Sequence, residues 1–444
     1  MTWDLLEEAK KMIAIRSISQ EGNRAAVQFV APFCEKLGFN LTFQAPAGGS
    51  TGEDLNLIAH TVPPNSGDLC PKGLLWVTHL DTVPPGDLSL WTETGGDPYC
   101  ATIKGEKLYG LGSADTKVDI LCKLKAIETV GLKNVKIPFA LVGSYGEERG
   151  LAGIKRLRES EVMHPRFALV SEASDLRPVL KHKGILYMKL FFNSPLPQAG
   201  EGLGVRELTF HGKAAHGSTP HLGDNAIEKA FQWLFEEQAK EPNLQLISVE
   251  GGTVHNIVPE KCLLKVAKGA NPSPQIDFLK KFWQIVERVD QFLEKDRDEA
   301  FDPPVTTRNI GVIRQEGDRL LIEFDYRLIP STEGNTLFAL LKEIGQIAGA
   351  ELKVLSSNPP LDTSLQSEIV ERVTTALRSV GSEISFPVKS GNTEGAILAM
   401  MGAEAVVIGP GKAVGNIHKP NEHNEISQLQ RAVDFYTAFL RQFC

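Results

Sequence analysis

The first part of the chain alternates short apolar segments with amphipathic ones. The apolar segments at 73–78, 137–142 and 166–170 predict buried strands, and the stretches at 118–130 and 151–160 predict helices. Alternating strands and helices are typical of a mostly parallel sheet covered by helices on both faces. We therefore predict an α/β fold for residues 1–178.

The pattern changes after this point and later returns. Between 179 and 331, alternating polar and apolar residues at 207–210 and 320–325 predict half-buried antiparallel strands, and 225–240 and 275–295 predict long helices. From 332 to 444 the α/β pattern resumes, with helices expected at 336–348, 367–380 and 426–443 and a strand at 405–408. We predict that residues 1–178 and 332–444 form one domain, interrupted by an α+β insertion at 179–331.

Composition and charge narrow the possible partners. The 444 residues are 42% hydrophobic and 23% charged, which is near the average of a soluble globular protein. The net charge is 47 − 55 = −8 and no basic stripe occurs, so nucleic-acid binding is not expected. The six cysteines are scattered without a CxxC pair. No membrane-spanning run or signal peptide is recognisable, and we expect a cytoplasmic protein without a membrane partner.

Acidic residues and a histidine follow the predicted strands. His79 and Asp81 come after the first strand, Glu147 and Glu148 after the second, and Glu172 after the third. Asp115 follows a glycine-rich turn that leads into a predicted helix. We expect all of them at the carboxyl ends of strands, the edge at which ligands bind in open α/β sheets.

Gathered carboxylates repel one another in a dry cleft unless a cation compensates their charge. Imidazole together with carboxylate suits zinc, and this set is too large for one tetrahedral ion. It fits two ions that share a bridging carboxylate. A second histidine is then needed, and His418 supplies it, with His423 as the nearby rival.

Eight motifs occur in an order that resembles a known family. They are His79-x-Asp81-Thr, Gly110-x-Gly112-x-x-Asp115, Gly146-Glu147-Glu148, Ser171-Glu172, Gly212-Lys-Ala-Ala-His216, Gly251-Gly-Thr-Val-His-Asn256-Ile-Val-Pro259, Ser390-Gly-Asn-Thr-Glu394 and His418-x-x-Asn-Glu422. The chain resembles the dizinc amidohydrolases and metallopeptidases that include acetylornithine deacetylase, succinyl-diaminopimelate desuccinylase, aminoacylase and carboxypeptidase G. The resemblance implies a catalytic domain and an inserted lid or dimerisation domain.

The resemblance also implies roles for individual residues near the metals. Asp115 would bridge two Zn²⁺ ions, for which Co²⁺ can substitute. His79 and Glu172 would hold one ion, and Glu148 and His418 the other. Glu147 would be the general base, and Asp81 would orient His79.

Further roles fall in and after the insertion. By resemblance, His216 would stabilise the oxyanion, and because it comes from the partner subunit in many relatives, a homodimer is implied. Asn256, Arg327, Gly391 and Thr393 would hold the substrate carboxylate; His255 has no assigned role. Asp325-Tyr-Arg327 arrives later in the chain than in typical relatives, and the longer insertion also resembles dipeptidase branches, some of which are monomers.

Three functions follow as expectations. The first is hydrolysis of the amide bond in a small N-acyl amino acid, as in acetylornithine deacetylase or succinyl-diaminopimelate desuccinylase. The second is a dipeptidase or carboxypeptidase that uses the same metals. The third is a catalytically silent relative that only binds a ligand, which would predict a missing ligand or base, although every such position is filled.

Overall fold

The computed structural model describes residues 3–48, 52–193, 196 and 204–444. The chain divides into two compact units. The first contains Met1–Lys181, Leu361–Val388 and Thr393–Cys444, and the second contains His182–Pro360 and Lys389–Asn392. Short strands lie where the chain passes from one unit to the other: β8 (Lys181–His182), β16 (Leu361–Asp362) and β17 (Val388–Lys389).

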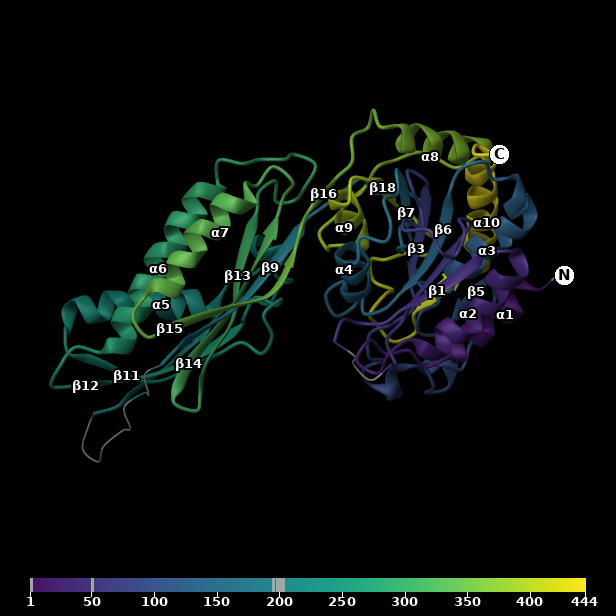
Figure 1. Cartoon of the computed structure of the whole chain (residues 1–444). Coiled ribbons are helices and arrows are strands. Elements are labelled where there is room, and N and C mark those ends of the chain that lie inside the picture. Colours follow the sequence, from purple (N-terminus) through teal and green to yellow (C-terminus); the bar gives the residue numbers. More distant parts are fainter. Residues whose placement is uncertain (1–2, 49–51, 194–195, 197–203) are drawn as a thin grey trace. The chain divides into compact units, whose positions relative to one another are not determined.

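The first unit is built on a six-stranded sheet with the order β1-β2-β6-β3-β7-β18 (Figure 1). Its strands are β1 (Asn40–Gln44), β2 (Asn56–His60), β3 (Leu74–His79), β6 (Phe139–Ser144), β7 (Phe167–Val170) and β18 (Glu404–Val407). The last four pair in parallel, whereas β2 is antiparallel to both of its neighbours. Strands β3, β6, β7 and β18 therefore end at one edge of the sheet, where loops that carry ligand-binding residues are expected.

Helices cover both faces of this sheet, as predicted. One face packs on α1 (Leu5–Ala14), α2 (Arg24–Leu37), α3 (Asp119–Val130), α8 (Glu368–Ser379) and α10 (Ile426–Arg441), and the other on α4 (Ala152–Glu159) and α9 (Glu394–Met400). Strand β3 shows why two layers form: Leu74 and Trp76 enter one core, and Leu75 and Val77 enter the other. A strand buried on both sides reads as a continuous apolar run, which is what the sequence displays.

A small antiparallel sheet adjoins the loops of the first unit. It consists of β4 (Thr102–Lys104), β5 (Lys107–Tyr109) and β19 (His423–Glu425), in the order β19-β5-β4. Short 3₁₀ helices lie at Leu88–Leu90, Thr92–Thr94 and Leu132–Asn134. Asp115 follows β5, so the expectation that it ends a strand of the central sheet is wrong; it lies in the loop that leads into α3.

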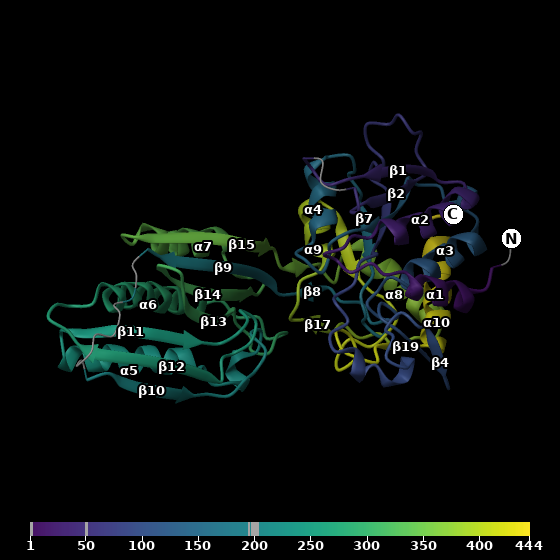
Figure 2. The same cartoon turned by 90° about the horizontal axis from the view of Figure 1, so that it is seen from below.

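The second unit is a seven-stranded antiparallel sheet with helices on one face (Figure 2). In the order β10-β12-β11-β13-β14-β9-β15, its strands are Arg206–His211, Lys261–Lys268, Leu244–Gly251, Thr307–Glu316, Arg319–Leu328, Gly184–Phe192 and Ala350–Asn358. Its helices are α5 (Ala226–Lys240), α6 (Pro274–Leu293) and α7 (Gly334–Lys342), with 3₁₀ turns at Pro220–Leu222 and Glu343–Gln346. This arrangement confirms the predicted α+β class of the insertion.

The second unit ends later than the sequence pattern suggested. The predicted boundary at 331 placed the following helix and strand in the first domain, but α7 and β15 belong to the second unit. Strand β15 pairs with β9 from Ala350 to Asn358, and α7 buries Leu337 and Leu341 in the same core. An amphipathic helix has the same period whichever sheet it covers, so periodicity alone does not assign it.

Across the residues that the structure describes, none of the helices combines the length and the apolar character needed to cross a bilayer.

Candidate metal centre

His79 presents a buried ring nitrogen to the carboxylate of Asp115. It is the last residue of β3 and is 1% exposed. Its Nδ1 lies 3.0 Å from the backbone oxygen of Asp81, a contact that orients the ring. The other nitrogen, Nε2, makes no hydrogen bond to any described residue and lies 3.4 Å from Asp115 Oδ1. A histidine whose Nδ1–H donates to a backbone carbonyl while Nε2 points at a carboxylate has the orientation of a metal ligand.

Asp81 organises the loop that follows β6. Its carboxylate accepts the backbone N–H groups of Glu147 and Glu148, at 3.2 Å each, one on each oxygen. The same carboxylate lies 3.8 Å from His79 Nδ1. The backbone oxygen of Asp81 therefore orients His79 more closely than its side chain does, and the carboxylate itself holds the two glutamates.

Asp115 lies between two imidazoles that come from distant parts of the sequence. Its Oδ1 faces His79, whereas its Oδ2 lies 2.9 Å from His418 Nε2. His418 Nε2 is also 3.1 Å from Glu148 Oε1. The backbone of His418 is left-handed, with φ of 57°, a conformation that an L residue adopts at a cost. Asp115 therefore presents one carboxylate oxygen to each of two imidazoles.

Two groups of donor atoms are close enough to hold metal ions. One comprises His79, Glu147 and Glu148, and the other Asp115, Glu148 and His418; within each group the atoms lie within 4.8 Å of one another. Both groups mix imidazole with carboxylate, the donor set that suits zinc. The side chains present therefore fit a dinuclear centre.

The pKa shifts of the acids and histidines in these two donor groups also favour a bound cation. Burial raises the pKa of Glu147 well above its usual value, and the charges of Glu172 and Glu148 raise it further. Burial would lower the pKa of His418, but hydrogen bonds to Asp115 and Glu148 outweigh it and raise that pKa to about 11. Burial alone would raise the pKa of Asp115, yet the two histidines hold it below its usual range. The cluster favours positive charge at its centre.

Glu172, the remaining predicted ligand, lies just beyond β7 and is 6% exposed. Its charge acts on Glu147 and on Glu394, so it belongs to the same buried region. It is not part of either group of closely spaced donors among the described residues.

The predicted residues of the second unit lie near one another within that unit. His216 Nδ1 accepts the backbone N–H of Ser218 at 3.1 Å, so a neutral ring carries its proton on Nε2. Arg327 donates from Nε to Asp325 at 2.9 Å, and its charge lowers the pKa values of His216 and His255, with burial as the larger cause in both. The backbone oxygen of Asn256 accepts the Gly217 N–H at 2.7 Å.

Thr393 and Gly391 fall in different units. Thr393 is fully buried in the first unit and caps α9, with its hydroxyl accepting the Gly395 N–H at 3.2 Å. Gly391 is a half-buried residue of the second unit. This capping bond is a structural role for Thr393 that the sequence motif did not predict.

Sequence reasoning assigned no role to two buried acids, Glu394 and Glu422. Glu394 opens α9, and burial raises its pKa to about 7. Glu422 is 1% exposed, and burial raises its pKa to about 8. Both lie in the motifs that carry the family resemblance, and an acid in a motif that also holds a predicted site residue was the available signal.

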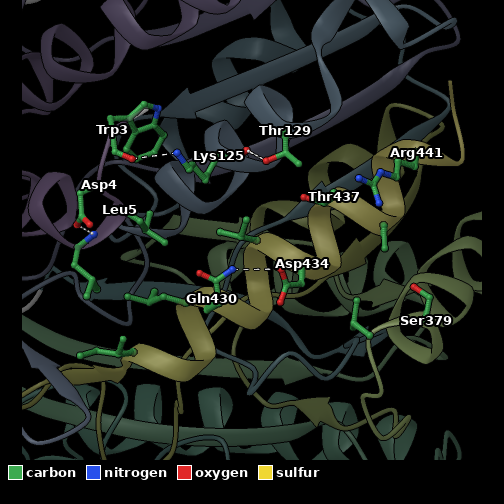
Figure 3. Close-up of a pocket in the computed structure, with 16 residues that line it drawn as sticks. Trp3, Asp4, Leu5, Lys125, Thr129, Ser379, Gln430, Asp434, Thr437 and Arg441 are labelled. Carbon is green, nitrogen blue, oxygen red and sulfur yellow. Dashed lines mark hydrogen bonds between the residues drawn. The ribbon is translucent and has the colours of Figure 1, made fainter. Parts of the chain in front are cut away.

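A separate cavity of about 770 Å³ lies on the first unit between α1, α3, α8 and α10 (Figure 3). Its polar side chains bond within the cavity wall: Lys125 donates to the backbone oxygen of Trp3, and Gln430 to Asp434. None of the predicted site residues lines it. We therefore take the acidic cluster, and not this cavity, as the candidate metal site.

Comparison with known proteins gives consistent matches. The family described as "Peptidase family M20/M25/M40" matches residues 75–442. The chain is 25% identical to an acetylornithine deacetylase of Myxococcus xanthus over 447 residues, which cover 98% of this chain and 96% of that protein. It is similar in structure to an aminoacylhistidine dipeptidase from Vibrio alginolyticus, with a TM-score of 0.70, 18% identity and coverage of 99% and 96%. An M20 family metallo-carboxypeptidase from Sulfolobus solfataricus gives a TM-score of 0.63 at 20% identity, with coverage of 100% and 99%.

Proposed function

The chain belongs to peptidase family M20/M25/M40, and from that premise we propose that it uses two zinc ions to hydrolyse the amide bond of a small N-acyl amino acid. The observation that carries the proposal is the position of Asp115, whose two oxygens face His79 and His418 separately. The full-length similarity to an acetylornithine deacetylase favours an acyl amino acid as the substrate class.

The metal assignment is the one that the family resemblance implies, and the donor group of Asp115, Glu148 and His418 supports one of its two sites. Asp115 would be shared, His79 and Glu172 would complete one site, and Glu148 and His418 the other. When bound, the two ions activate water and polarise the substrate carbonyl. Co²⁺ has similar ligand preferences and is expected to substitute.

Glu147 would act as the general base and then as the acid. A group that accepts a proton and returns it works best with a pKa near the working pH, and burial moves the pKa of Glu147 upward. The proton that Glu147 takes from water passes to the leaving amine nitrogen. The C–N bond breaks and a carboxylic acid and an amine are released.

The second unit would supply groups that recognise the substrate. His216 Nε2–H would donate to the developing oxyanion. Arg327 is held at Nε by Asp325, and its two terminal nitrogens form no hydrogen bond to other described residues. These two nitrogens can form paired hydrogen bonds with the substrate carboxylate. Asn256, Gly391 and Thr393 would contribute to binding the same carboxylate.

A dipeptidase or carboxypeptidase activity is the second candidate. It is favoured by the structural similarity to a dipeptidase and a carboxypeptidase, both of which cover nearly the whole chain. Either activity uses the same metals and base, so the acyl group of the substrate is what separates them.

The test is a substrate panel assayed with the zinc-loaded and the cobalt-loaded protein. N-acetyl and N-succinyl amino acids are compared with dipeptides by following the release of free amine. We expect turnover of the acyl amino acids to exceed that of the dipeptides; turnover of dipeptides alone would replace the first candidate by the second. A protein that binds no metal and hydrolyses neither class would refute both.

We further propose a homodimer in the cytoplasm. Light scattering coupled to gel filtration measures the mass in solution, and a single species of about 97 kDa, twice the 48.5 kDa chain, is expected. A species at the mass of one chain would show that the protein is a monomer in solution and would refute the homodimer.

A further inference from the structure

The segment around His418 is joined to the loop that carries Asp115, although the two are far apart in sequence. His423 in β19 pairs with Tyr109 in β5. The Gly110 N–H donates to the backbone oxygen of Glu422 at 2.9 Å, and the Asn424 side chain donates to the backbone oxygen of Ser113 at 3.0 Å. These bonds bring two predicted ligands of one metal group onto neighbouring backbones.

The side chain of Glu422 lies at the centre of this junction. Its Oε1 accepts the backbone N–H of Ala114 at 2.9 Å and that of Asp115 at 3.0 Å, across 307 residues in the latter case. Its Oε2 is buried and makes no hydrogen bond to a described residue. The charge of the buried Lys117 also interacts with Glu422. Burying a carboxyl group is costly, so a purely space-filling role would be served better by an apolar residue.

The two N–H groups explain why an oxygen is needed here. A buried backbone N–H without an acceptor destabilises the conformation that presents it. If Glu422 did not accept from Ala114 and Asp115, the backbone of this loop would have to turn its N–H groups elsewhere. The Asp115 carboxylate would then leave its place between His79 and His418.

We propose that Glu422 is a positioning residue for the metal centre: its Oε1 fixes the backbone of Asp115 and so sets the place of the shared carboxylate. The proposal rests on the proposed function in taking Asp115 as the shared ligand. It assigns to Glu422 an acceptor role, for which a neutral amide oxygen at the same place suffices.

Three variants separate an acceptor role from charge and from packing. In Glu422→Gln the amide oxygen still accepts both N–H groups, whereas Glu422→Leu retains bulk and removes the acceptor. Glu425→Leu is the matched control, because Glu425 lies three residues on in the same segment with an exposed side chain. Circular dichroism and thermal melting of the metal-free proteins establish whether each variant folds.

Two measurements follow. Titration with Co²⁺, read from its visible absorption, gives metal affinity and stoichiometry. Hydrogen exchange of the metal-free protein, read at the Ala114 and Asp115 amides, reports the bond itself. We expect Glu422→Leu to weaken Co²⁺ binding by about 10- to 100-fold and to speed exchange at these amides by roughly tenfold or more. Glu422→Gln and the control should stay within about threefold of the parent protein, clearly below the change of about 10- to 100-fold that loss of such a residue produces.

Two outcomes would overturn the proposal. One is unchanged Co²⁺ affinity in Glu422→Leu despite faster exchange, and the other is Glu422→Gln as weak as Glu422→Leu. If Glu422→Leu does not fold, Glu422→Asp replaces it; the shorter side chain cannot keep both bonds, so parent-like affinity there also refutes the role. Failure of the parent protein to bind Co²⁺ would instead refute the proposed function, while the exchange data would still test the hold of Glu422 on Asp115.

Discussion

The two units handle charge in opposite ways. In the first, carboxylates gather: Asp115, Glu147 and Glu148 lie beside the buried His79 and beside His418, whose side chain is 49% exposed. In the second, the buried Arg327 already pairs with Asp325. A cluster of acids is stabilised by a cation, whereas an arginine that is paired through Nε can offer its terminal nitrogens to an anion. The comparison teaches that changes in the first unit should alter chemistry and metal content, and changes in the second should alter substrate binding.

The sharpest test of this division is Glu147→Gln. The amide cannot accept a proton from water, so kcat should fall by roughly 10²- to 10⁴-fold. Metal content should stay near that of the parent protein, because Glu147 is proposed as base and not as ligand. Steady-state kinetics and elemental analysis check both points, with Glu159→Gln at the exposed end of α4 as control. A loss of metal equal to the loss of activity would contradict the assignment.

Asp81→Asn should have the next largest effect. The aspartate uses both oxygens to accept the N–H groups of Glu147 and Glu148, and asparagine offers one oxygen and a donor instead. We expect metal affinity to fall about 10- to 100-fold, as for other residues that hold ligands. Competition with a chelator measures the affinity. Asp87→Asn changes an exposed acid of the same loop and should leave the affinity unchanged. Parent-like metal binding in Asp81→Asn would show that Glu147 and Glu148 keep their places without the Asp81 carboxylate.

Arg327→Lys tests the second unit. Lysine keeps the positive charge beside Asp325 but lacks the fork that binds a carboxylate through two nitrogens. Losing one charged hydrogen bond to substrate predicts a rise in KM of roughly tenfold with little change in kcat. The control is Arg319→Lys on the same strand, where the side chain pairs with Glu351. A fall in kcat at unchanged KM would place Arg327 in the chemical step instead.

Asn225→Ala should have the smallest effect and leave the metal centre intact. Asn225 caps α5 by accepting the Ile227 N–H at 2.9 Å. Loss of the cap and of the bond that the Asn225 side chain donates to the backbone oxygen of Ile310 predicts a decrease of about 2 kcal/mol in the free energy of unfolding, without loss of metal. Denaturant unfolding measures it against Ser367→Ala, because Ser367 begins α8 without a capping bond. Metal loss in Asn225→Ala would contradict the expectation that the second unit can be destabilised without changing metal binding by the first.

Many of the strands and helices were predictable, because the pattern of hydrophobic and polar residues within each segment is enough to recognise them. The apolar run of β3 was recognised because its residues are buried on both faces, and α3 was expected at nearly its observed bounds. The predicted ligands His79, Asp115, Glu148 and His418 do converge in space. The units' boundary was not predictable from the pattern, because the helix period of α7 does not tell which sheet it covers.

What the sequence alone determined is therefore the set of elements and the kinds of side chains offered at loop positions, since both depend on residues near one another in the chain. The tertiary structure alone decided which atoms meet: that Asp115 faces two imidazoles, and that the Glu422 side chain accepts two N–H groups of a loop about 300 residues earlier. The physical reason is that hydrogen bonds and charge interactions act over a few ångströms. Only the folded chain brings such distant residues within that range.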